Sequence, residues 1–172
     1  MSTPAVWAVN YARQADVDWR AWELYEKHPE AVAAECHKLL FLQMACEKLC
    51  KAHLISKNSS PQELQTSHAY IASGLPLVVR QQILEMRRDL KGMKGVMRHV
   101  RYLANEIEVL NPAVDRGGRR PDNCEYPWED EAGVLRSPLD WTFSPSQLLL
   151  VPTGRTFLKI LRLAINRLLA GE

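Results

Sequence analysis

The chain has 172 residues, and its 22 Lys and Arg side chains against 20 Asp and Glu give a formal net charge of +2. This length fits one domain, residues 1–172, with a core large enough to need no disulfide or structural metal. The hydrophobic content of 47% and charged content of 24% exclude a disordered or collagen-like chain. Because the charge balance is nearly even, any nucleic-acid-binding surface must be local.

Nothing in the sequence predicts targeting or a membrane span. The first twelve residues carry no charge, which a secretory signal peptide would need. The longest uncharged stretch, residues 64–79, contains Gly74 and Pro76 and is too short to cross a bilayer. Four cysteines, three of them on one predicted helix, do not form a secreted disulfide framework. We therefore expect a cytoplasmic protein without membrane contact.

Helical periodicity dominates the first half of the chain, and no segment alternates as a strand would. A first helix is predicted from about Asn10 to Lys27 and is ended by Pro29. Pro29 also opens a longer helix that runs to about Ser56. Its apolar face consists of Leu39, Leu42, Cys46, Leu49 and His53. The tetrapeptide 60–63 has the form of a capping box, which predicts a short third helix ended by Gly74 and Pro76.

The second half begins with a long predicted helix, from Leu77 to Leu110, in which Gly92 and Gly95 indicate a kink or break near residues 91–95. Asn111-Pro112 ends it. Residues 112 to about 154 are rich in proline, glycine and charge, so we predict a long irregular excursion. A final amphipathic helix is expected from about Pro152 to Ala170.

The second predicted helix carries a recognisable stretch, Gln43-Met44-Ala45-Cys46-Glu47-Lys48-Leu49-Cys50-Lys51-Ala52. It resembles the "QqAvEKalKA" signature of HEPN domains, which are small helical nucleotide-binding or RNA-associated domains. Ser67-His68 stands where that family has its "tH" pair, and Glu125-Tyr126-Pro127-Trp128 where it often shows "RYPd". The resemblance covers roughly residues 10 to 170.

This resemblance implies an all-α, HEPN-like up-and-down bundle of four to five main helices, with the excursion before the last helix. It also implies a homodimer, and RNA or a nucleotide as the ligand. HEPN ribonucleases use an Arg followed four to six residues later by His. None of the five histidines in this chain has an Arg at that spacing, so the sequence predicts no catalytic residues, and an enzyme is the less favoured interpretation.

Basic residues concentrate between Arg80 and Arg101, where seven are basic and two are acidic. If this segment is helical, one stripe contains Arg87, Lys91, Lys94, Arg98 and Arg101, and the last helix repeats the pattern with Arg155, Lys159 and Arg162. Together the two stripes predict a phosphate-binding surface. The alternative is that these side chains only flank the core, with their stems on it and their charges in water.

The irregular segment supplies two further candidates, Arg119 and Arg120, which follow a Gly-Gly pair and suit bidentate phosphate contacts. Its aromatic residues, including Trp128 and Trp141, either stack on bases or anchor the segment to the bundle. Cys46, Cys50 and His53 share a face, but with no second ligand pair at zinc-site spacing we interpret them as core residues and expect no metal or other cofactor.

Three functions remain open. The first is a non-catalytic module that holds RNA or a nucleotide on Arg87, Lys91, Lys94, Arg98, Arg101, Arg119 and Arg120. The second, which the resemblance allows, is the protein-interaction subunit of a nucleotidyltransferase toxin–antitoxin or defence pair. The third is a ribonuclease with a site of another kind.

Overall fold

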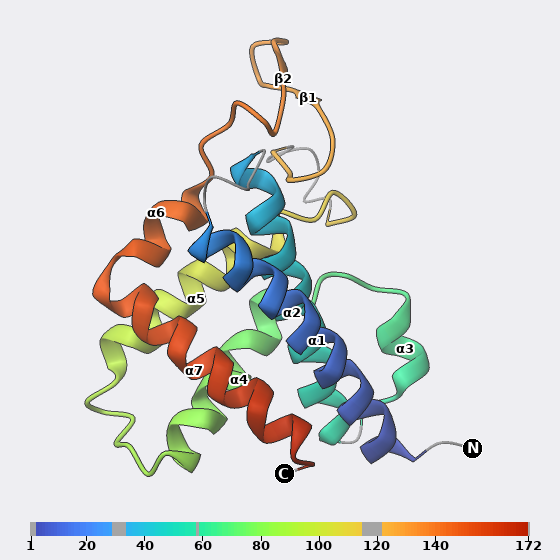
Figure 1. Cartoon of the computed structure of the whole chain (residues 1–172), viewed down its shortest axis with the longest axis vertical. Helices are drawn as coiled ribbons and strands as arrows, with labels where there is room; N and C mark the ends of the chain where they lie inside the picture. Colours follow the sequence, from blue (N-terminus) through green and yellow to red (C-terminus); the bar gives the residue numbers. More distant parts are fainter. Residues whose placement is uncertain (1–2, 29–33, 58, 115–121, 172) are drawn as a thin grey trace.

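Helices make up most of the protein, as the sequence predicts, and its long helices form an all-α bundle (Figure 1). The structure is a computed structural model that describes residues 3–28, 34–57, 59–114 and 122–171. Arg119 and Arg120, two of the predicted phosphate ligands, lie outside the described residues. No helix in the described part of the chain is long and apolar enough to cross a membrane.

Helix α1 spans Pro4–Lys27 and begins earlier than the predicted Asn10. Its start has a local cause, because the Thr3 hydroxyl accepts a hydrogen bond from the Val6 N–H at 3.4 Å and Pro4 occupies the first helical position. The end at Lys27 and the buried face of Ala15, Trp19 and Trp22 are as predicted.

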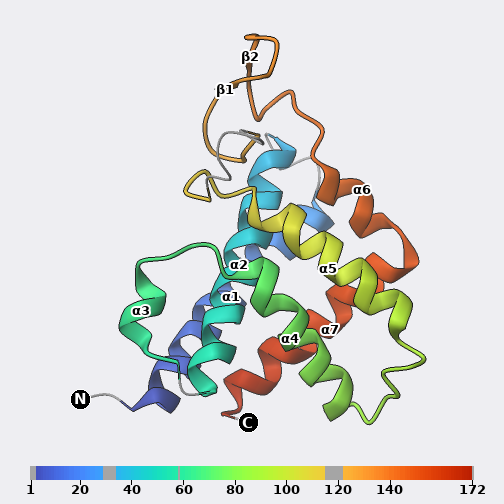
Figure 2. The ribbon, with the colours of Figure 1, turned by 180° about the vertical axis from the view of Figure 1, so that it is seen from behind.

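Helix α2 spans Glu35–Ser56 and lies beside α1 in both views (Figures 1 and 2). The backbone of Ala34 is extended, so α2 begins at Glu35 rather than near Glu30; the predicted opening at Pro29 falls in 29–33, outside the described residues. Every residue of the predicted apolar face, Leu39, Leu42, Cys46, Leu49 and His53, is buried.

The predicted third helix is in fact two helices, α3 (Pro61–Gln65) and α4 (Ile71–Glu85). Ser60 makes no capping hydrogen bond to the backbone, and Gly74 and Pro76 lie inside α4 instead of ending a helix. Burial explains the difference. A proline inside a helix removes one backbone hydrogen bond and costs about 3 kcal/mol, but α4 buries Ile71, Leu75, Val78 and Val79, each worth roughly 1.5–3 kcal/mol.

The helix predicted from Leu77 to Leu110 is interrupted, as Gly92 and Gly95 indicated, but the break starts earlier and is longer than expected: residues 86–93 form a connection between α4 and α5 (Lys94–Glu108). The chain turns back at Arg87, whose φ is +52°. Here the Arg87 N–H donates to the Leu84 carbonyl at 2.8 Å and the Arg88 N–H to that of Ile83 at 3.1 Å. This is the Schellman pattern that ends helices, and it precedes the glycines that indicated a break.

The segment before the last helix is largely irregular, as predicted, but it contains a short antiparallel hairpin of β1 (Trp128–Glu129) and β2 (Leu135–Arg136). The expectation of no strand is therefore wrong here. Asp130 organises the turn, since its carboxylate accepts the Ala132 and Val134 N–H groups at 2.9 Å and pairs with Arg136. These donors lower the pKa of Asp130.

Two helices complete the chain, α6 (Ser144–Leu150) and α7 (Pro152–Leu169), the second with the predicted bounds to within one residue. The shared core draws its largest buried side chains from α1, α2, α4, α5 and α7 and from Phe143 just before α6. The hairpin projects from one end of this bundle, and the termini lie at the other end (Figure 1).

Candidate phosphate-binding surface

Three cations from two helices meet around a shallow hollow of about 280 Å³, which we call the α4–α5 hollow. Arg80 comes from α4, Lys94 from the first turn of α5, and Arg101 from two turns further along α5. Its apolar part consists of Leu90 and Met97. All three cationic side chains are exposed, so they are accessible to a ligand from solvent.

Among the described residues, no carboxylate lines the α4–α5 hollow. The ion pairs formed between described residues involve none of its three cations. The acidic residue in the adjacent connection, Asp89, accepts the backbone N–H of Lys91 at 2.9 Å. Like charges held close together without counter-charges raise the local positive potential. The arrangement therefore suits an anion with several acceptor oxygens, such as a phosphate group.

The structure changes the predicted stripe of five basic residues. Lys94, Arg98 and Arg101 are exposed on one face of α5, as predicted. Arg87 and Lys91 are exposed too, but they lie in the connection 86–93 and not on that helix face. Sequence reasoning counted Arg80 in the basic segment without assigning it to the site. The two glycines that indicated a break were the signal for a hairpin that brings Arg80 to α5.

The basic stripe on α7 is used largely within the fold. Arg162 pairs with the buried Asp16 carboxylate of α1, which also binds Arg20 at 2.7 Å. The Nε of Arg155 donates to the Leu150 carbonyl at 3.1 Å. Lys159 remains exposed. Most of this predicted second cationic face is thus occupied by structural contacts, so the α4–α5 hollow is the better candidate for a phosphate-binding surface.

A buried polar cluster assembles residues of the stretch 43–52 that suggested the resemblance. The Glu47 carboxylate lies 2.7 Å from Nζ of Lys51, 3.2 Å from Nε2 of Gln43 and 3.1 Å from Nδ1 of His68. Gln43, Glu47 and Lys51 are all at least nine-tenths buried. This network attaches the connection after α3 to α2 and engages both carboxylate oxygens of Glu47, so it is a structural cluster.

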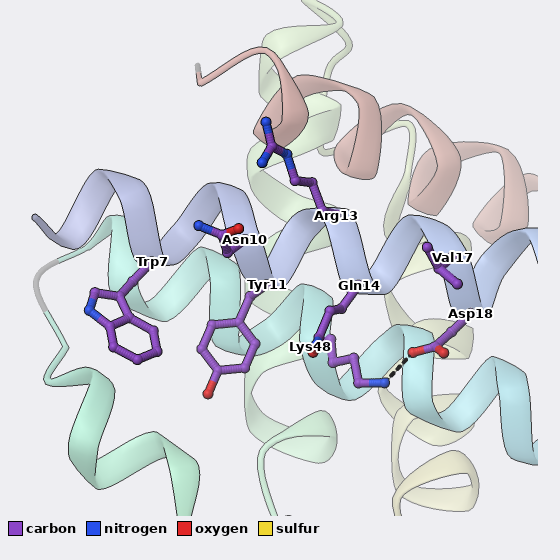
Figure 3. A pocket seen from close by; sticks show the side chains of 8 residues that line it. All are labelled: Trp7, Asn10, Tyr11, Arg13, Gln14, Val17, Asp18 and Lys48. Carbon is purple, nitrogen blue, oxygen red and sulfur yellow. Dashed lines mark hydrogen bonds and ion pairs between the residues drawn. The ribbon is translucent and has the colours of Figure 1, made fainter. Parts of the chain in front are cut away.

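A larger hollow than the α4–α5 hollow, about 640 Å³, is an open groove along α1 that sequence reasoning did not find. Trp7 and Tyr11 lie on the same side of α1, with ring centroids 6.4 Å apart, and Gln14 and the Asp18–Lys48 pair follow further along the helix (Figure 3). Arg13 points to the other side of α1. The prediction missed Trp7 because it started this helix at Asn10.

The two tryptophans of the irregular segment serve as anchors, whereas Tyr126 is exposed. Trp128 is buried and meets Trp141 edge-on at a centroid distance of 5.4 Å, while Arg136 lies over the Trp141 ring. The anchoring alternative therefore applies to both tryptophans. Cys46, Cys50 and His53 are buried in the core, and the described parts of the chain contain no cluster of three or more metal-ligating side chains.

A comparison of the chain with models of known protein families, with curated proteins and with solved structures finds no match.

Proposed function

We propose that this protein is a non-catalytic RNA-binding module that holds phosphates of the RNA backbone on the α4–α5 hollow and the adjacent cations Arg87, Lys91 and Arg98. The observation that carries the proposal is the approach of Arg80, Lys94 and Arg101 to one hollow that no described carboxylate lines. Such clusters bind phosphate oxygens and give affinities that depend strongly on salt. The resemblance to HEPN domains, which are RNA- or nucleotide-associated, supports the same ligand class.

The environment of the histidines supports the non-catalytic part of the proposal. Nε2 of His99 lies 3.0 Å from the Leu148 carbonyl, His68 lies against Glu47, and His53 is buried. A ribonuclease needs a general acid or base that reaches the scissile phosphate. Two of these histidines are thus engaged by polar contacts within the fold, and His53 is enclosed in the core.

The test is the binding of a fluorescently labelled single-stranded RNA across a salt series. Lys94→Gln/Arg101→Gln should weaken binding and lower the log–log salt slope by about 0.7 for each phosphate that the variant no longer binds. The matched control, Arg13→Gln/Lys27→Gln, removes the same charge from exposed positions on α1 and should leave the slope unchanged. Equal slopes for the two double variants would contradict the proposal, and RNA cleaved by the wild-type protein on a denaturing gel would contradict its non-catalytic part.

A second candidate function, a protein-interaction subunit, is favoured by the α1 groove and by three exposed apolar side chains on the same helix, Val6, Val17 and Leu24. The partner implied by the resemblance is a nucleotidyltransferase. Co-purification with a nucleotidyltransferase encoded next to this chain, abolished in Val17→Glu, would support this function. Light scattering on the chain alone would reveal the homodimer that the same resemblance implies.

A further inference from the structure

A second recess, about 460 Å³ in volume, is lined by residues of α1, α2, α4 and α7. The termini of the chain lie at the same end of the bundle (Figures 1 and 2). We call this recess the end cavity. Its apolar lining includes Val9 of α1, Ile55 of α2 and Leu168 of α7. Its charged lining consists of Lys57, Glu85 and Arg167. This volume lies within the range of small-molecule sites, which combine an apolar lining with a few polar groups.

Arg167 is the charged group that the fold holds most firmly here. Its Nε donates to Oε1 of the buried Gln82 at 3.0 Å, which fixes the guanidinium against α4. Its Nη2 is buried and has no hydrogen-bond partner in the structure as described. Because Nη2 is closed to solvent, an acceptor can reach this guanidinium only at the part that lines the end cavity.

The charges around Arg167 favour an anion as this acceptor. Among the described residues, the lining of the end cavity contains two cations, Arg167 and Lys57, and one carboxylate, that of Glu85. Oε1 of Glu85 already accepts a hydrogen bond from Nε2 of Gln81 at 2.5 Å. His53 is buried close enough to both cations to feel their charges, and its Nδ1 has no described partner. Burial and the charges of Arg167 and Lys57 lower the pKa of His53 to about 4, so it is neutral at pH 7.

We propose that the end cavity binds a small organic monoanion, a carboxylate with a compact apolar body, with Arg167 as the anchor of the carboxylate and Lys57 as a second cation. The apolar body would contact Val9, Ile55 and Leu168. Charge-assisted bonds from a guanidinium to a carboxylate are among the strongest hydrogen bonds in proteins, which favours the charged ligand over a neutral one of the same shape. This site is separate from the α4–α5 hollow and shares no lining residue with it.

The test is calorimetric titration at pH 7 with benzoate, and with benzamide as the neutral ligand of matching shape. Wild-type protein should bind benzoate at least about tenfold more tightly than benzamide, because only the carboxylate gains the charge-assisted bonds. Arg167→Gln should abolish this preference. Glu85→Gln, which removes the like charge from the lining, should strengthen benzoate binding. Arg98→Gln, the control, removes a cation near the α4–α5 hollow and should leave benzoate binding unchanged.

Lys57 and Glu85 are exposed, so we expect variants at these two positions to fold even if Arg167→Gln does not. Lys57→Gln should weaken benzoate binding and Glu85→Gln should strengthen it. No detectable binding of benzoate at millimolar concentration, equal binding of benzoate and benzamide, or weaker binding in Glu85→Gln would each overturn the proposal. Because Arg98→Gln is expected to affect RNA but not benzoate, failure of this site can be distinguished from failure of the RNA-binding proposal.

Discussion

Nδ1 of His68 lies 3.1 Å from Oε1 of Glu47, although the two residues are 21 positions apart in the chain. The same carboxylate oxygen is 2.7 Å from Nζ of Lys51, and the other oxygen accepts from Gln43. One buried carboxylate thus connects α2 to the segment that leads from α3 to α4. The contact explains why polar residues occupy a helix that is otherwise largely buried.

Glu47→Gln should destabilise the protein by about 3–5 kcal/mol, because it leaves the buried Lys51 ammonium without its counter-charge. The free energy of unfolding in urea measures this effect. His68→Ala, which removes an exposed partner of the same carboxylate, should cost less than about 1 kcal/mol. Glu47→Gln/Lys51→Met should be more stable than Glu47→Gln alone; equal stability of the two would show that the unpaired ammonium is not the cause.

Arg87→Gly should stabilise the fold by about 1 kcal/mol, because Arg87 has φ +52° in the turn that ends α4 and glycine adopts that conformation without a steric cost. The midpoint of urea unfolding should therefore rise. Arg88→Gly is the control, since Arg88 does not have a positive φ and glycine there should lower the midpoint. A fall of the midpoint in both variants would contradict this account of the turn.

Acid should destabilise the protein through His53. Its pKa in the folded state is about 4 because of burial and the nearby positive charges of Arg167 and Lys57, whereas an unfolded histidine titrates near 6.5. Between these values the unfolded chain binds more protons than the folded one, so stability is complete above about pH 6.5 and falls as the pH drops towards 4. The decrease attributable to His53 is at most about 3 kcal/mol.

Urea unfolding of wild-type protein and His53→Leu at pH 7 and pH 4.5 measures this contribution. The substitution should reduce the difference in stability between the two pH values. His37→Gln, at an exposed position of the same helix, is the matched control and should retain the full difference. An identical pH dependence in wild type and His53→Leu would show that another group is responsible.

Glycine-to-alanine substitutions should have opposite effects in α7 and α5. A Cβ on Gly154 would lie 2.2 Å from the Leu148 carbonyl oxygen, so Gly154→Ala must displace backbone and should cost about 1–3 kcal/mol. A Cβ on Gly95 would meet nothing within 4 Å, so Gly95→Ala should stabilise α5 by about 0.5–1 kcal/mol. Thermal unfolding of both variants measures the two effects, and a stabilised Gly154→Ala would contradict the close approach of α6 to α7.

The sequence by itself determined the features that depend on nearby residues. Periodicity located the buried faces of α1 and α2 and the all-α class. Pro29 located the end of α1 at Lys27, and the predicted end of α2 at Ser56 is also confirmed. The basic residues of α5, Lys94, Arg98 and Arg101, share one face because a helix repeats every 3.6 residues. These signals depend on residues within a few helical turns of one another, so they can be interpreted without knowledge of the tertiary contacts.

Only the tertiary structure decided where distant residues meet. Gly74 and Pro76 look like chain-breaking residues, yet both lie inside α4, where the burial of that helix outweighs their local preference. Arg87 shows no local signal for a left-handed turn, yet the reversal there brings Arg80 to Lys94 and Arg101. The cost of each local violation is a few kcal/mol, less than the free energy of burial when α4 and α5 pack against the core. The α4–α5 hollow exists because packing overrides those local preferences.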